Sequence, residues 1–111
     1  MTWMTEAQLQ AKFLKYANAL DKTVARKYPG TGLVKAGMPD VLVARNGVTV
    51  YIEFKKPGKY FPATDGLSAA QERCIRKLRE AGQKVLVTDS FNEAKEWLDE
   101  HCSTGRYADP D

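Results

Sequence analysis

The chain has 111 residues, of which 43% are hydrophobic and 28% are charged, and its formal net charge at pH 7 is +3. This length is sufficient for one compact domain and too short for two. Because no apolar run is long enough to span a membrane and the N-terminus lacks a signal-peptide pattern, we expect a cytoplasmic protein without membrane contact.

The N-terminal part of the chain predicts a helix followed by a short strand. Thr5 and Gln8 form a capping-box pattern, which is typical of a helix start. Apolar residues then recur at helical spacing: Leu9, Phe13, Tyr16, Ala17 and Leu20. Residues 23–28 could extend the helix or form a strand, and their alternation favours the strand. Proline and glycine in residues 28–32 predict a loop.

A hairpin is predicted next, with strands at residues 40–45 and 48–56 joined by Asn46-Gly47, a dipeptide typical of a type I′ turn. The first strand is apolar enough for burial on both faces. In the second strand, Val48, Val50, Ile52 and Phe54 share one face, and Thr49, Tyr51, Glu53 and Lys55 share the other. Pairing about this turn places opposite each other those residues whose numbers sum to 93, so Asp40 faces Glu53.

A loop, a helix and a further strand follow the hairpin. Residues 57–66 are rich in proline, glycine, lysine and aromatic residues, and could form a flap close to a functional site. Ser68 and Gln71 form a second capping box, which predicts a helix that ends at Gly82. On the apolar side of this helix, Cys74 is expected to be a buried free thiol. Residues 84–88 predict a short buried strand.

A last helix begins at Ser90 with Glu93 and carries Ala94, Trp97 and Leu98 on its inner face. Residues 102–111 lack periodicity and predict a flexible tail, which leaves residues 1–101 as the single folded domain. The element order is therefore α-β-β-β-α-β-α. Because a helix connects the third strand to the fourth, we expect an α/β fold with a mixed central sheet flanked by helices.

Asp40, Glu53 and Lys55 form the candidate catalytic set. Like charges that face each other across a ladder repel, so the opposed carboxylates favour a cation between them. Mg²⁺ could be bound there by both carboxylates and the backbone carbonyl of Phe54. Lys55, on the same face, could orient or deprotonate an attacking water and neutralise charge on a phosphate. The alternative is a surface Glu-Lys pair with Asp40 as a turn residue.

Basic and aromatic residues near this set are candidate contacts to nucleic acid. The candidates are Lys35, Lys56, Lys59, Arg73 and Arg76. Each could equally be a solvated charge. Tyr60 and Phe61 could stack on an exposed base or could pack the loop against the domain. Cys74 and Cys102 have no metal-ligand spacing with His101, which is expected at a helix C-terminus.

Three segments together resemble the VRR-NUC family. They are Gly37-Met38-Pro39-Asp40-Val41-Leu42, Glu53-Phe54-Lys55-Lys56-Pro57-Gly58, and Leu67-Ser68-Ala69-Ala70-Gln71 followed by Ala81-Gly82-Gln83-Lys84-Val85. The resemblance runs from about Glu6 to about Leu98. It implies the restriction-endonuclease-like αβββαβ core of the PD-(D/E)xK superfamily, here with an additional C-terminal helix. It also implies Mg²⁺- or Mn²⁺-dependent cleavage of DNA without an organic cofactor.

The family pattern implies roles for five residues. Asp40 and Glu53 correspond to metal ligands and Lys55 to the catalytic lysine. Glu6 matches a first-helix glutamate that completes the metal site in related junction resolvases, or it is a helix-start acid favoured by the dipole. Gln71 matches a glutamine that lines the active site, or it is the N3 residue of the capping box.

The absence of a separate sequence-reading domain favours recognition of DNA shape. Stand-alone members of the family resemble Holliday junction resolvases, so we expect a homodimer that acts on branched DNA, above all four-way junctions, in repair or recombination. A C₂ dimer would present two matching sites to such a junction. The alternatives are a flap or nicking nuclease, a non-catalytic DNA-binding module and an RNA-processing nuclease.

Overall fold

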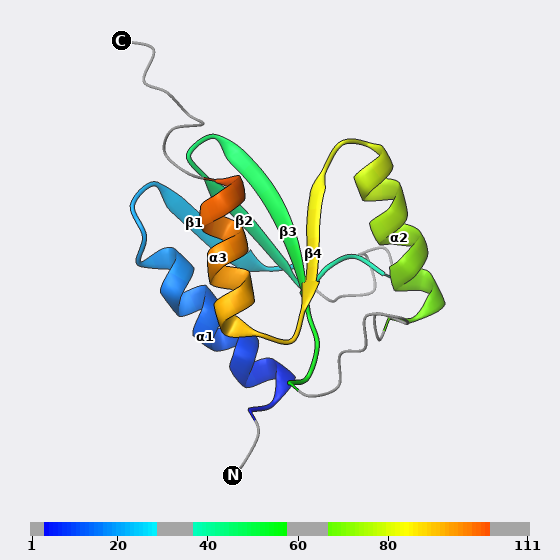
Figure 1. Ribbon diagram of the computed structural model, residues 1–111, viewed down its shortest axis with the longest axis horizontal. Helices are drawn as coiled ribbons and strands as arrows, with labels where there is room; N and C mark the ends of the chain where they lie inside the picture. Colours follow the sequence, from blue (N-terminus) through cyan, green and yellow to red (C-terminus); the bar gives the residue numbers. More distant parts are fainter. Residues whose placement is uncertain (1–3, 29–36, 58–66, 103–111) are drawn as a thin grey trace.

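The structure, a computed structural model, describes residues 4–28, 37–57 and 67–102 (Figure 1). The helices are α1 (Glu6–Asn18), α2 (Ala69–Glu80) and α3 (Phe91–His101). The strands are β1 (Thr23–Lys27), β2 (Val41–Arg45), β3 (Val48–Phe54) and β4 (Lys84–Thr88). The predicted element order is confirmed, and the ambiguous segment after α1 is a strand. No helix within these ranges is both long and apolar enough to cross a membrane.

The four strands form one mixed sheet in the order β1-β2-β3-β4. The first three strands are antiparallel, and β4 runs parallel to β3 because α2 forms the crossover between them. Val41 pairs with Ile52, which is the predicted hairpin register. Asn46 and Gly47 have φ values of +52° and +81°, the positive angles that a type I′ turn requires. Turn chemistry therefore determines which residues of β2 and β3 face each other.

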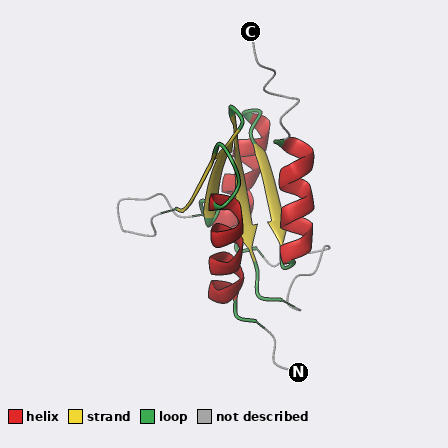
Figure 2. Cartoon of the chain, turned by 90° about the vertical axis from the view of Figure 1, so that its left-hand side faces the viewer, coloured by secondary structure: helices red, strands yellow, loops and turns green. Residues whose placement is uncertain are grey.

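Helices cover both faces of the sheet (Figure 2). The larger core packs α1 and α3 on one face and includes Phe13, Ile52, Phe54 and Leu98, all fully buried. The smaller core packs α2 on the other face around Ile75, Val85 and Val87, with Tyr51 from β3 packed against it. Each fully buried large apolar side chain contributes about 1.5–3 kcal/mol to folding. The predicted alternation along β3 is thus confirmed.

Local capping defines how each helix begins. Both predicted capping boxes are formed, Thr5 with Gln8 and Ser68 with Gln71. In α3 the Ser90 hydroxyl accepts a hydrogen bond from the backbone N–H of Glu93, but the Glu93 carboxylate bonds the hydroxyl of Thr88 instead of returning to Ser90. The α3 start is therefore tied to the end of β4.

Three expectations about burial require correction. Cys102, which we expected in the flexible tail, is fully buried, and its carbonyl accepts a 2.9 Å hydrogen bond from Asn46 Nδ2. The packed part of the chain therefore reaches one residue further than expected. Cys74 is only half-buried, with its Sγ 3.3 Å from Met38 Sδ, and in β2 Ala44 is exposed because burial alternates along that strand.

Candidate active site

The hairpin brings Asp40 and Glu53 into direct contact. Asp40 immediately precedes β2, and Glu53 lies near the end of β3. The backbone N–H of Asp40 donates to Glu53 Oε1, and the backbone N–H of Phe54 donates to Asp40 Oδ2, each over 3.1 Å. Each carboxylate is therefore held by the backbone of the opposite strand. This is the juxtaposition that the sequence register predicts.

The surroundings of the pair disfavour two negative charges. Glu53 is 1% exposed, and burial raises its pKa from 4.5 to about 7, with the nearby charge of Asp40 acting in the same direction and Lys55 opposing it. Burial also raises the pKa of Asp40, against the lowering effects of the Phe54 N–H, Lys55 and Gln10. The site is therefore a part-buried acidic pair that a positive ion would stabilise.

Lys55 and Gln71 complete a hydrogen-bonded cluster with Glu53. Lys55 Nζ lies 3.4 Å from Glu53 Oε2 and donates to Gln71 Oε1 over 3.1 Å. Gln71 Nε2 donates to Glu53 Oε2 over 2.8 Å, while Gln71 Oε1 also accepts from the backbone N–H of Ser68. Gln71 therefore caps α2 and bonds Glu53 and Lys55 at the same time, and its role in an active site stays a prediction.

Glu6 lies beside the acidic pair. Its pKa is raised first by burial and then by the charge of Asp40, while Lys55 lowers it. Glu6 is thus within electrostatic reach of both residues. Across residues 4–28, 37–57 and 67–102, however, no three His, Cys, Asp or Glu side chains are grouped closely enough to hold a metal ion. In this arrangement Glu6 does not complete a three-carboxylate cluster.

Gln10 lies near this site and is not among the residues predicted from the sequence. Its side chain is only 7% exposed, and Gln10 is among the neighbours that lower the pKa of Asp40. The available signal was a glutamine one helical turn after Glu6 and next to the buried Leu9, which places a polar group at the edge of the apolar stripe. A buried amide needs a partner, so its position could have indicated a polar site beneath α1.

The donor set suits a divalent cation of the Mg²⁺ type. Such ions prefer oxygen ligands and are commonly held by one or two carboxylates together with water. Glu53 supplies a buried carboxylate and Asp40 a half-buried one, and their charges repel each other. The proposed participation of the Phe54 carbonyl stays a prediction.

Three of the five candidate nucleic-acid contacts lie within the described residues. Lys56 is exposed directly after Lys55, and Arg73 and Arg76 are exposed on α2, the helix whose first turn carries Gln71. Lys35, Lys59, Tyr60 and Phe61 lie outside the described residues.

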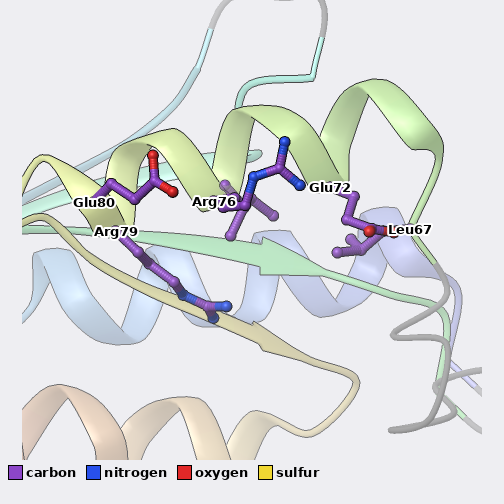
Figure 3. A pocket seen from close by; sticks show the side chains of 6 residues that line it. Leu67, Glu72, Arg76, Arg79 and Glu80 are labelled. Carbon is purple, nitrogen blue, oxygen red and sulfur yellow. The ribbon is translucent and has the colours of Figure 1, made fainter.

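A surface pocket of about 380 Å³ follows the side of α2 (Figure 3). It is lined by Leu67, Glu72, Ile75, Arg76, Arg79 and Glu80. Arg79 extends toward β4, where its guanidinium donates to the carbonyl of Val85 over 2.8 Å. None of the residues of the acidic cluster lines this pocket, so the two features are separate.

Comparison with known proteins assigns the family. The sequence profile of the VRR-NUC domain matches residues 2–92. A solved structure described as "VRR_NUC domain" is 30% identical, with a TM-score of 0.67 over 86% of this chain and 95% of that one. A second, described as "VRR_NUC domain protein", is 20% identical, with a TM-score of 0.74 over 94% of this chain and 93% of the other. No curated protein matches the chain. With its sheet topology and its motifs in place, the chain belongs to the VRR-NUC domain family, a family of nuclease domains.

Proposed function

We propose that this protein is a divalent-metal-dependent endonuclease of the PD-(D/E)xK type that hydrolyses phosphodiester bonds in DNA. The observation that carries the proposal is the pairing of Asp40 with Glu53, with Lys55 Nζ 3.4 Å from Glu53 Oε2, in a chain of a nuclease family. Crowding two acids beside a lysine in part-buried surroundings raises the free energy of the unliganded protein. Metal-assisted phosphate chemistry gives a reason for that arrangement.

In the proposed mechanism Asp40 and Glu53 would hold Mg²⁺ or Mn²⁺, and Glu6 and the Phe54 carbonyl are further candidate ligands. Such an ion would lower the pKa of an attacking water and offset phosphate charge. The water oxygen forms a bond to phosphorus and gives up a proton to solvent, the bond to the leaving oxygen breaks, and the leaving oxygen takes up a proton from solvent. Lys55 stabilises the negative charge that accumulates on the phosphate oxygens. Gln71 holds the Lys55 ammonium and the Glu53 carboxylate in position relative to each other through one hydrogen bond to each.

For the substrate, we propose branched DNA and above all the four-way junction. Lys56, Arg73 and Arg76 are exposed and would contact backbone phosphates, and Lys35 and Lys59 remain proposed contacts of the same kind. Phosphate contacts position a protein on DNA without reading its sequence, which suits recognition by shape. A homodimer would supply two sites for symmetric cuts. Cleavage of flaps or nicks in repair is the alternative within the same chemistry.

The direct test is cleavage of labelled four-way, flap, splayed and linear duplexes with Mg²⁺, Mn²⁺ or EDTA. We expect metal-dependent cuts, and symmetric cuts in four-way junctions. Lys55→Ala should abolish cleavage while junction binding persists, and Lys77→Ala, an exposed change on α2, should cleave normally. Absence of cleavage of every substrate with metal present would refute the enzyme. Equal loss of cleavage and binding in Lys55→Ala would favour a DNA-binding module, and preference for matched RNA junctions would favour an RNA-processing nuclease.

A second pair of variants separates the two roles of Gln71. Gln8 occupies the same capping-box position in α1, where it exchanges hydrogen bonds with Thr5. Gln71→Ala and Gln8→Ala should each lower the free energy of unfolding by about 0.3–1.5 kcal/mol, the range for loss of one capping device. Only Gln71→Ala should slow cleavage, because only Gln71 also bonds Glu53 and Lys55. Equal cleavage rates for the two variants would limit Gln71 to a capping role.

A further inference from the structure

The backbone of Lys55 is held by β4. Lys55 is the first residue after β3, which ends at Phe54. On the β2 side the ladder has already ended, with the pair of Val41 and Ile52. On the β4 side it continues, because the backbone N–H of Lys55 donates to the carbonyl of Thr88 over 2.9 Å. The position of Lys55 relative to the sheet therefore depends on the end of β4.

Thr88 is itself fixed by the first turn of α3. It is the last residue of β4 and is fully buried. Its hydroxyl donates to the carboxylate of Glu93 and accepts from the backbone N–H of Ser90, whose nitrogen lies 3.0 Å from Thr88 Oγ1. The Ser90 hydroxyl in turn accepts from the backbone N–H of Glu93 over 3.1 Å. A buried hydroxyl that both donates and accepts holds a defined position, so these bonds join the end of β4 to the start of α3.

These contacts reach the candidate site through Lys55. Successive side chains of an extended segment point to opposite faces, so a rotation of the Lys55 backbone would turn its side chain away from the face that carries Glu53. The far end of that side chain is held as well: Nζ lies 3.4 Å from Glu53 Oε2 and donates to Gln71 Oε1 over 3.1 Å. A lysine side chain is flexible, so fixing its backbone narrows the positions that the ammonium group can take.

We infer that Thr88 is a positioning residue of this site: its hydroxyl, bonded to Glu93 and Ser90, fixes the end of β4, and its carbonyl holds Lys55 where the lysine acts on the phosphate. This inference rests on the proposed nuclease function. It assigns a contribution to α3, which packs on the face of the sheet opposite to α2 and Gln71.

Thr88→Val and Thr88→Ser form a matched pair for the test. Valine has the shape of threonine without the hydroxyl, whereas serine keeps the hydroxyl and loses the buried methyl group. Both changes should lower stability, but only valine removes the bonds to Glu93 and Ser90. The readouts are kcat and KM for the labelled DNA that the wild type cuts best, binding of that DNA in EDTA, and hydrogen exchange of the Lys55 amide by NMR.

For Thr88→Val we expect kcat to fall by about 10–100-fold with KM and DNA binding unchanged, because Lys55 acts on charge that develops in the transition state. The Lys55 amide should exchange about 2–10-fold faster than in Thr88→Ser, as expected for the loss of one hydrogen bond. Thr88→Ser should retain the wild-type kcat. A purely structural role would lower the activity of both variants alike.

Glu93→Ala tests the same link from the exposed surface of α3, where folding tolerates substitution better. It should lower kcat in the same direction as Thr88→Val, and Glu96→Ala, at another exposed position of α3, should match the wild type. Should Thr88→Val fail to fold, judged by circular dichroism, the comparison of Glu93→Ala with Glu96→Ala decides.

Two outcomes contradict the inference in distinguishable ways. If the wild type cleaves DNA, and Thr88→Val and Thr88→Ser have the same kcat and the same exchange rate at Lys55, then Thr88 does not position Lys55 and the proposed function stands. If the wild type cleaves none of the DNA substrates with metal present, the proposed function fails, and the role of Thr88 in catalysis fails with it, whatever the exchange rate at Lys55.

Discussion

At the scale of a single residue, the buried carboxylate of Glu53 lowers the folding stability of the metal-free protein. Its carboxylate is 1% exposed and lies against Asp40, with which it shares a hydrogen bond from the Asp40 backbone. Burial raises the pKa of Glu53 to about 7, so the folded protein binds a proton there that the unfolded chain releases near pH 4.5. Between these two pH values, stability falls as the pH rises, and above the higher one the loss is complete.

Replacing Glu53 by glutamine should therefore stabilise the metal-free protein in a pH-dependent way. We expect no difference from the wild type below pH 4.5, since both side chains are then neutral. At pH 8, Glu53→Gln should raise the free energy of unfolding by as much as about 3 kcal/mol, from 1.36 kcal/mol per pKa unit. Urea denaturation in EDTA at several pH values measures the effect.

Glu96→Gln, at an exposed position of α3, is the control for this pH series and should show no such dependence. If the difference in the free energy of unfolding between Glu53→Gln and the wild type stays constant from pH 4 to pH 8, the buried charge of Glu53 does not cause the pH dependence of stability. The variant should also lose cleavage at every pH, because it removes a proposed metal ligand.

At the scale of elements, the loop before β2 is fitted against the first turn of α2. Gly37 has a φ of +94°, and a Cβ at this position would lie 2.4 Å from the carbonyl oxygen of Ala70. Only glycine permits this approach of two backbones. Asp40 lies three residues after Gly37, and Gln71 directly follows Ala70. The contact therefore brings the acid-bearing loop and the glutamine-bearing helix to the same place.

Gly37→Ala and Gly82→Ala form a matched pair for this contact. Gly82 has a similar φ of +90°, but a Cβ there would meet no atom within 4 Å. Gly82→Ala should cost about 1–2 kcal/mol, the penalty of a left-handed conformation. Gly37→Ala should cost about 1–3 kcal/mol more, the usual effect of overpacking, because backbone atoms must separate. Urea denaturation of both variants measures the difference.

Cleavage by the same two variants shows whether the contact matters to the site. Gly37→Ala should cleave more slowly, since it displaces Asp40 from Gln71, whereas Gly82→Ala should retain the wild-type rate. Equal stability losses in the two variants would mean that the loop has room to move away from α2 without cost.

At the scale of the whole molecule, the site lies where elements from both halves of the chain meet. The acids come from the β2–β3 hairpin, Gln10 from α1 below one face, and Gln71 from α2 on the other. A ligand that binds this site should therefore stabilise the entire fold, by RT ln(1 + [L]/Kd) when it binds only the folded state.

Mn²⁺ at 100 times its dissociation constant should accordingly raise the free energy of unfolding by about 2.7 kcal/mol. At the same Mn²⁺ concentration, the gain in the free energy of unfolding should be larger at pH 8 than at pH 5.5, because Glu53 must lose its proton to bind the ion. Thermal unfolding with and without EDTA measures it. Asp40→Asn should lack the gain, and a wild type whose melting temperature is unaffected by Mn²⁺ or Mg²⁺ would contradict metal binding at this site.

Local signals were sufficient for much of the fold. Helix starts at Thr5 and Ser68 follow from capping chemistry, and the Asn46-Gly47 turn follows from the need for positive φ. These signals depend only on residues close in sequence, so they can be recognised without knowledge of the packing. The prediction was wrong for Cys102, because its burial depends on contacts with Asn46, far away in the chain.

The sequence by itself determined the element order, the β2–β3 register and hence the opposition of Asp40 and Glu53, because turn type and strand periodicity act over a few residues. Only the tertiary structure decided that the buried Gln10 lies near Asp40, that Gln71 both caps α2 and bonds Glu53, and that Glu6 lies beside the acids without closing a cluster. Those contacts depend on where each helix layer lies over the sheet. That placement results from packing of the whole core, which no local pattern encodes.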